Sequence, residues 1–148
     1  MTDDNQTLFA SIGIQLQDTA RAWRLKLDQR LRPLGLSQAK WRALVLVDRA
    51  GDGVTQKELA ELLGVEGPTL VRLLDRLEAD GWVERRMCAH DRRSRRIHLS
   101  QNARAMLAKI EAVAANLRRE LLSGMPGDDL AALHRMLRDI RRRVDETP

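Results

Sequence analysis

Six arginines lie in a twelve-residue segment that runs from Arg85 to Arg96 and reads RRMCAHDRRSRR. One aspartate accompanies them, so the segment carries a net charge of +5, which equals the formal net charge of the whole chain. Arginines this close together repel one another, whereas binding to a polyanion would stabilise them. The chemistry that this segment predicts is therefore the binding of phosphates.

A helix predicted from Pro68 to Asp80 carries a second set of residues that could bind nucleic acid. Thr69, Arg72 and Arg76 are spaced three and four residues apart, so they share a face of this helix that its leucines leave free. Arginine can bind a guanine edge through two hydrogen bonds in the major groove, and threonine can contact a phosphate or a thymine methyl group. This face is therefore a candidate for reading DNA sequence.

Ordinary surface chemistry is the alternative for both groups of arginines. Arg72 with Asp75, and Arg76 with Asp80, could form ion pairs on a solvated helix face, and the arginine segment could be a solvated run of charge. Because the arginine segment follows the helix so closely in the sequence, we favour DNA binding for both.

The residues before this helix are predicted to form three more helices. Apolar residues recur at steps of three and four from Leu8 to Leu31, and Pro33 and Gly35 end this long first helix. Ser37 is a plausible N-cap for a second helix that ends near Ala50. A helix as long as the first cannot bury its apolar stripe on a small domain alone, so a partner helix or a second subunit is implied.

The middle of the chain is predicted to fold as a winged helix-turn-helix. A capping box from Thr55 to Glu58 begins a third helix, which ends at Gly64, and a short turn leads to the helix at Pro68. Residues 82–85 and 96–99 alternate as two short strands do, with the arginine segment as their connection. Helix, short turn, helix and basic hairpin is the order of that motif, and it makes the predicted fold mostly helical, of the α+β class.

Two further helices complete the predicted fold. Ser100 can cap the first of them, residues 124–127 break it, and the last helix has an apolar seam with heptad spacing. The seam consists of Leu130, Leu133, Leu137, Ile140 and Val144. We therefore expect residues 1–36 and 101–148 to form a helical dimerisation region, and residues 37–100 to form the DNA-binding region.

Three segments of the chain resemble the MarR family of transcriptional regulators, and within it the SlyA-like branch. They are RAWRLKLDQRLRPLGLSQAKW (residues 21–41), QKELAELLGVEGPTLVRLLDRLEADGWVERR (residues 56–86) and CAHDRRSRRIHLS (residues 88–100). The similarity covers about residues 8–145. It implies a homodimer with interlocking terminal helices, whose two winged lobes bind a pseudo-palindromic operator in double-stranded DNA.

The resemblance also assigns roles in the wing. It implies that a wing arginine, Arg93 or else Arg92, enters the minor groove and that Asp91 holds it by a salt bridge. The predicted DNA contacts are Pro68, Thr69, Arg72 and Arg76 in the recognition helix, and Arg85, Arg86, Asp91, Arg92, Arg93, Arg95 and Arg96 in the wing.

Control by a small aromatic or phenolic ligand, such as an aromatic carboxylate or its thioester, is a further implication of the resemblance. Trp23, Arg24, Trp41 and Val45 could line its pocket, with the arginine holding the anion, although tryptophans at helical spacing also form ordinary cores. Cys88 lies among arginines that could stabilise its thiolate, so a redox input is conceivable. The alternative for Cys88 is an inert residue of the hairpin.

Other classes of protein have less support in the sequence. The single cysteine precludes an internal disulfide, the first residues MTDDNQ show no secretory signal, and the longest apolar run, residues 43–47, cannot span a membrane. The sequence has no nucleotide-binding or catalytic motif and no metal-ligand spacing among its histidines and cysteine, so we expect no cofactor, metal or enzyme activity. We expect a cytoplasmic, nucleoid-associated protein. A ligand-independent architectural DNA binder and a protein-binding winged helix stay as alternatives.

Overall fold

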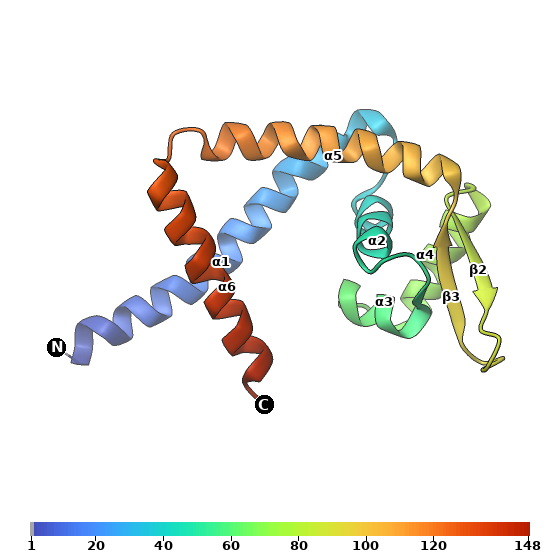
Figure 1. Cartoon of the computed structure of the whole chain (residues 1–148), viewed down its shortest axis with the longest axis horizontal. Helices are drawn as coiled ribbons and strands as arrows, with labels where there is room; N and C mark the ends of the chain where they lie inside the picture. The colour runs from blue at the N-terminus through green and yellow to red at the C-terminus, as the bar shows by residue number, and fades with distance from the viewer. Residues whose placement is uncertain (1) are drawn as a thin grey trace. The chain divides into compact units, whose positions relative to one another are not determined.

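The computed structural model describes residues 2–148, with side chains from residue 5 onward, so the first residue of the predicted 1–36 segment lies outside the described residues. The chain forms two compact units, residues 1–113 and 114–148, and each is described by itself. Helix α1 (Thr2–Leu31) is followed by a 3-10 turn, η1 (Arg32–Leu34), as Figure 1 shows. Gly35 closes this turn with φ 75°, a left-handed conformation that glycine adopts without steric cost. The predicted end of the first helix is confirmed.

The next three helices begin and end at the predicted signals. Ser37 caps α2 (Gln38–Arg49) by accepting a hydrogen bond from the backbone of Lys40. Helix α3 (Gln56–Leu63) begins with the predicted capping box, in which Thr55 accepts from the Glu58 backbone and Glu58 accepts from the Thr55 backbone. Helix α4 (Gly67–Ala79) follows after a short turn and has a proline in its first turn. The start of α4, the predicted recognition helix, has no side-chain cap, because its N-cap residue Glu66 forms no capping hydrogen bond.

The sheet has three strands, although the sequence analysis expected two. Strands β1 (Val54–Thr55), β2 (Val83–Met87) and β3 (Arg95–Leu99) are antiparallel in the order β1-β3-β2. β1 was missed because two residues are too few to show an alternating pattern. β2 and β3 are also longer than predicted, so Arg85, Arg86, Arg95 and Arg96 lie in paired strands, and only residues 88–94 connect them. We call β2, β3 and this connection the wing, and residues 88–94 the wing tip.

One apolar core joins the helices and the sheet of the first unit. Most leucines of α3 and α4 are buried with Leu44 of α2 and Ile97 of β3, whereas Leu73 is half-buried and Leu62 is exposed. The core members from α3 and α4 are Leu59, Leu63, Leu70, Leu74 and Leu77. Burial of side chains of this size stabilises each by about 1.5–3 kcal/mol relative to exposure. This core holds α4 and the wing in one winged lobe, by which we mean residues 37–100, and it confirms the predicted winged helix-turn-helix fold.

The C-terminal part of the chain is helical, as predicted. Helix α5 (Gln101–Leu122) begins after Ser100, which accepts a hydrogen bond from the backbone of Ala103 at 3.1 Å. Helix α6 (Gly127–Glu146) has acidic residues in its first turn and no buried residue. No helix among residues 2–148 combines the length and the apolar character needed to cross a membrane.

Candidate nucleic-acid interface

The face of α4 that is predicted to contact DNA bases is exposed, and no acidic residue of the helix pairs with its arginines in the described part of the chain. Thr69, Arg72 and Arg76 all lie at the surface, and Pro68 occupies the first turn. Arg72 bonds only to a backbone carbonyl of its own helix, that of Pro68, at 3.4 Å. In the part of the chain that the structure describes, neither Arg72 nor Arg76 forms an ion pair. Their guanidinium groups are therefore available to a ligand.

The acidic residues that could have paired with these arginines are bound elsewhere. Asp75 forms an ion pair with Arg85 of the wing, 2.7 Å from its Nη2 atom, and Asp80 forms one with Lys40 of α2. Asp75 and Asp80 therefore do not form the surface ion pairs with Arg72 and Arg76 that the alternative interpretation required. The same contacts attach α4 to β2 on one side and to α2 on the other.

Arg85 ties the wing to the recognition helix. Its Nε and Nη2 atoms donate to Glu78 Oε2 at 3.1 and 2.6 Å, and its backbone amide donates to Glu78 Oε1 at 3.2 Å. These hydrogen bonds lower the pKa of the Glu78 carboxyl. The side-chain bond to Glu78 also raises the pKa of the Arg85 guanidinium, and the bond to Asp75 raises it further. The predicted contact of Arg85 with DNA stays a prediction, and it would compete with these bonds.

Two more wing arginines are engaged near the base of the sheet. Arg96 donates from Nη1 to the backbone carbonyl of Gly53 at 2.8 Å, which fastens β3 to the turn before β1. Arg86 pairs with Glu84 of its own strand at 2.9 Å, and both side chains are exposed. An exposed pair of this kind contributes about 0–1 kcal/mol, so Arg86 can exchange Glu84 for a phosphate at little cost.

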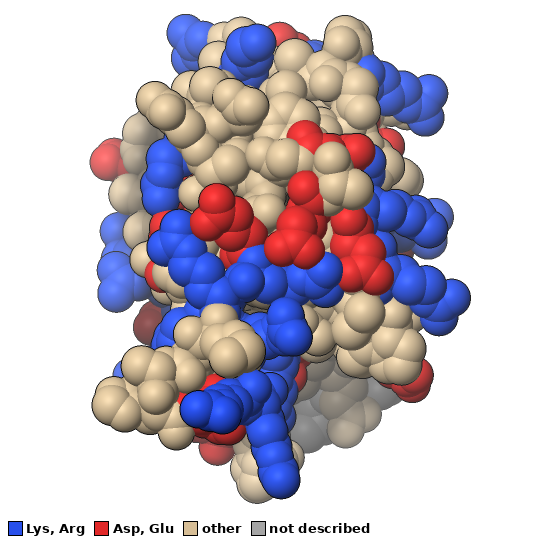
Figure 2. All heavy atoms as spheres, turned by 90° about the vertical axis from the view of Figure 1, so that its right-hand side faces the viewer, with Lys and Arg blue, Asp and Glu red and all other residues tan. Residues whose placement is uncertain are grey.

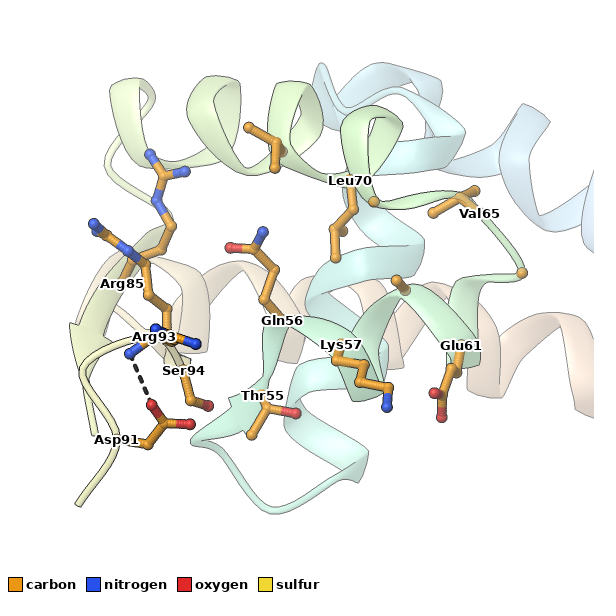
Figure 3. Close-up of a pocket in the computed structure, with 15 residues that line it drawn as sticks. Thr55, Gln56, Lys57, Glu61, Val65, Leu70, Arg85, Asp91, Arg93 and Ser94 are labelled. Atoms are coloured by element: carbon orange, nitrogen blue, oxygen red, sulfur yellow. Dashed lines mark hydrogen bonds between the residues drawn. The ribbon is translucent and has the colours of Figure 1, made fainter. Parts of the chain in front are cut away.

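Asp91 contacts Arg93 through the backbone of the wing tip. The Arg93 amide donates to Asp91 Oδ1 at 2.9 Å, as Figure 3 shows, and the Ser94 amide donates to the Asp91 carbonyl at 3.1 Å. The resemblance implied a salt bridge to the guanidinium, so the structure gives Asp91 a different contact, in which it shapes the turn. Within the described residues, Arg92, Arg93 and Arg95 form no ion pair and lie exposed.

A groove of about 870 Å³ separates the wing from the helix pair. Its walls come from the start of α3, the start of α4 and the wing, and Figure 3 shows Arg85, Arg93 and Lys57 among its lining side chains. Gln56 and Lys57 were not predicted as site residues, and only their place in the first turn of α3 could have suggested them. Figure 2 shows a group of lysine and arginine side chains below a band of acidic residues, with further lysines and arginines along the edges and at the top of this face. The groove is therefore open and lined by mixed charge.

Comparisons with known proteins agree with this geometry. Residues 34–94 match the sequence profile of the MarR family. The crystal structure of the transcriptional regulator PA3341 has 45% sequence identity and a TM-score of 0.82, and the match covers 92% of this chain and 99% of that one. The chain belongs to the MarR family. Solved members of this family include transcriptional regulators, and one member has been seen in complex with operator DNA.

Two further MarR-family structures are similar to this chain and contain a bound partner. A cysteine-to-serine mutant of MarR from E. coli, complexed with operator DNA, has 27% identity, a TM-score of 0.73 and coverage of 88% of this chain and 93% of that one. CouR from Rhodococcus jostii RHA1, bound to p-coumaroyl-CoA, has 26% identity, a TM-score of 0.72 and coverage of 87% and 90%.

The residues predicted to sense a ligand occupy different environments in this MarR-family chain. Trp41 is buried in the core, where its Nε1 atom donates to Asp28 of α1 at 3.1 Å. Trp23 and Val45 are half-buried and Arg24 is exposed. Trp41 is therefore a core residue, which was the alternative to a role in a pocket. A ligand pocket formed by the four residues stays a prediction.

Arg42 is a candidate anion-binding residue that the sequence analysis missed. It is half-buried on α2, directly after Trp41, and burial lowers the pKa of its guanidinium. The positive charge of Arg24 lowers that pKa further. Two cations that destabilise each other would gain from a bound carboxylate. No sequence rule singles out Arg42, because its closeness to Arg24 depends on how α1 packs on α2.

Asp52 is a structural residue at the base of the wing that the sequence analysis also missed. It has φ 61°, and its carboxylate accepts from the Leu99 amide at 2.8 Å and from Arg104 Nη2 at 2.7 Å. It thereby joins the turn before β1 to the end of β3 and to the start of α5. The Gly51-Asp52-Gly53 sequence predicted a turn, but not these distant partners.

Cys88 lies at the point where β2 ends and the wing tip begins. It is half-buried, and its backbone amide donates to the Ser94 carbonyl at 3.1 Å. A redox role for its thiol stays a prediction.

Proposed function

We propose that this MarR-family chain is a homodimeric, sequence-specific regulator that acts as a repressor or anti-silencer on a pseudo-palindromic operator. The observation that carries this proposal is the unpaired state of Arg72 and Arg76 on the exposed face of α4, since their neighbouring acids are bound to Arg85 and Lys40. E. coli MarR, a similar protein, has been seen with operator DNA. In this proposal α4 enters the major groove and its arginines contact base edges.

The wing supplies the contacts that position each lobe on DNA. We assign phosphates or the minor groove to the exposed Arg86, Arg92, Arg93 and Arg95, and a tie within the protein to Arg85 and Arg96. Two lobes that place α4 about 34 Å apart can enter successive major grooves on one face of the duplex. Phosphate contacts give affinity without sequence preference, so base choice belongs to α4.

Footprinting followed by base-pair substitution tests this assignment. We expect protection of a short inverted repeat, and we expect Arg72→Ala to lose about 1–3 kcal/mol of discrimination at one guanine. Arg142→Ala removes the same charge from an exposed position on α6 and serves as the matched control. Even protection of any DNA would instead support the architectural alternative. Affinity that Arg72→Ala and Arg93→Ala both leave unchanged would support a protein-binding winged helix.

Exposed apolar residues on the terminal helices support the homodimer. The seam of α6 is exposed at Leu133, Leu137, Ile140 and Val144, and α1 exposes Leu8, Phe9 and Ile12. We expect Leu137→Asp to give a monomer in sedimentation analysis and to lose operator binding. Met136→Asp, at a neighbouring exposed position outside the seam, is the control that keeps the dimer. A dimeric Leu137→Asp variant would contradict this use of the seam.

The proposed ligand is a small aromatic or phenolic compound, either a carboxylate or its thioester. Arg24 and Arg42 support it as an anion-binding pair, and CouR, a similar protein, has been seen with p-coumaroyl-CoA. A thermal-shift screen of aromatic acids and their thioesters, followed by a DNA-release assay, tests this. We expect Arg42→Gln to abolish the shift that a hit produces, and an unchanged shift would remove Arg42 from the site.

The remaining proposals rest on the sequence motifs. The segments at residues 21–41, 56–86 and 88–100 support placement in the SlyA-like branch, and the charge of the wing supports a cytoplasmic, nucleoid-associated protein. Mass-spectrometric oxidation of Cys88 by peroxide, measured together with operator affinity, tests a redox input.

A further inference from the structure

Helix α4 exposes one apolar side chain that the core does not use. Val71 is 37% exposed, and among the residues of α4, all of which the structure describes, it is the only large apolar side chain in this state. The leucines of the same helix are buried or half-buried. An exposed valine in the first half of a recognition helix lies where that helix meets the floor of the major groove.

The surroundings of Val71 differ from those of the reading arginines. Val71 shares a side of the helix with Asp75, one turn later, and it lines the groove that also contains Arg93 and Ser94. Asp75 is neutralised there by Arg85, at 2.7 Å. On the side that faces the wing, α4 itself contributes Val71 and an Asp75 that Arg85 neutralises, whereas Thr69, Arg72 and Arg76 make the other exposed side polar and cationic.

We propose that Val71 determines operator specificity by contacting the C5 methyl group of a thymine; this inference rests on the proposed function. The thymine methyl is the apolar group that base pairs present in the major groove, and apolar side chains are its usual protein contacts. The Val71 side chain has no polar atom, so it cannot bind phosphate and gains little from guanine. Val71 therefore adds a thymine position next to the base pairs that Arg72 and Arg76 read.

Replacing thymine by deoxyuridine, one position at a time, in the operator found by footprinting tests this contact. Deoxyuridine removes only the methyl group and keeps the base pair. For the wild-type protein we expect one position at which the change raises Kd about fourfold in one half-site and about 15-fold in both, since each buried methyl group is lost from an apolar contact. Fluorescence anisotropy with labelled duplexes measures these ratios.

The Val71→Ala variant decides whether Val71 is the residue that senses the methyl group. We expect it to bind the thymine operator as weakly as wild type binds the deoxyuridine operator, with no further loss when deoxyuridine is introduced. Alanine favours helix, so circular dichroism should show an unchanged fold. Leu62→Ala removes an exposed apolar side chain from α3 instead, and we expect it to keep the full deoxyuridine effect.

Two results would overturn the proposal while leaving the proposed function standing. The first is a specific operator in which no thymine position responds to deoxyuridine, and the second is a response that Val71→Ala retains in full. Failure of the proposed function has a different signature, because footprinting would then find no protected inverted repeat for any variant.

Discussion

Replacing Arg85 by methionine separates its tie to α4 from its predicted contact with DNA. The Arg85 side chain is 17% exposed, and its Nη2 atom lies 2.7 Å from Asp75 Oδ1 and 2.6 Å from Glu78 Oε2. The two carboxylates are 56% and 40% exposed, so water can solvate them once the guanidinium is gone. The variant therefore creates no buried, unpaired charge, which is the situation that makes such losses large.

The loss of stability follows from the exposure of these pairs. Partly exposed ion pairs contribute about 0.2–1 kcal/mol each, and methionine keeps most of the packing of the arginine stem. We expect Arg85→Met to lower the free energy of unfolding by about 1 kcal/mol and the Tm by about 3 °C. The loss should shrink in acid, because the Glu78 pKa is lowered in the folded state and its contribution disappears as pH falls through that pKa.

The salt dependence of operator binding measures the DNA contact itself. Each phosphate contact contributes about 0.9 to the slope of log K against log salt, so one arginine per lobe contributes about 1.8 to a dimer. Arg85→Met alone would add two unneutralised carboxylates, so the informative variant also carries Asp75→Asn and Glu78→Gln. We expect this triple variant to keep the wild-type slope, and Arg95→Met, from the exposed part of β3, to lower it by about 1.8.

A triple variant whose slope falls by about 1.8 would refute this reasoning. Arg85 would then leave its carboxylates on binding and contact a phosphate, as the sequence analysis predicted. An unchanged slope together with an unchanged Tm would refute the tie to α4.

Three further predictions concern the framework of the lobe. Gly53→Ala should destabilise the protein by about 1–3 kcal/mol in chemical denaturation, since Gly53 has φ +88° and a Cβ would lie 3.0 Å from His98 Cε1. Thr55→Ala should lower the Tm by a few degrees, about 2–4 °C, and should raise the Glu58 pKa in an NMR titration, because it removes the hydroxyl bond that lowers this pKa and keeps the larger effect of the Thr55 backbone bond. Trp41→Phe should cost about 1 kcal/mol through its lost hydrogen bond, and an unchanged Tm would count against that bond.

Local signals predicted the helical part of the fold because each acts within a few residues. The capping box at Thr55, the cap at Ser37 and the turn at Gly35 depend on neighbours in sequence, and the structure contains all three. The strand β1 and the lengths of β2 and β3 depend on pairing between residues eight or more positions apart. The sequence analysis missed β1 and predicted β2 and β3 too short. The alternating pattern is too weak to find the ends of a strand whose outer residues are arginines.

For the candidate site too, the sequence predicted what depends on local spacing and missed what depends on packing between elements. Spacing alone placed Thr69, Arg72 and Arg76 on one exposed face of α4. Sequence could not show that Asp75 binds Arg85, because Asp75 had an equally plausible partner within its own helix, in Arg72. The choice between these partners is made by the packing of β2 against α4, and it decides which arginine is available to DNA.

This choice also changes what the arginine segment does. Arg85 and Arg96 are bound within the lobe and Arg86 pairs with Glu84, so Arg92, Arg93 and Arg95 are the segment's arginines without an ion pair in the part of the chain that the structure describes. If these three and Arg86, which can exchange Glu84 for a phosphate, each contact one phosphate, a dimer makes eight contacts and its salt slope is about −7, roughly two thirds of what six arginines per lobe would give. Fewer positive charges of the wing are thus available to DNA than the sequence contains, because Arg85 neutralises the acidic residues Asp75 and Glu78 of α4. That neutralisation in turn leaves Val71 without an unpaired acidic neighbour one turn along α4, so an apolar contact of Val71 with a base can contribute to specificity.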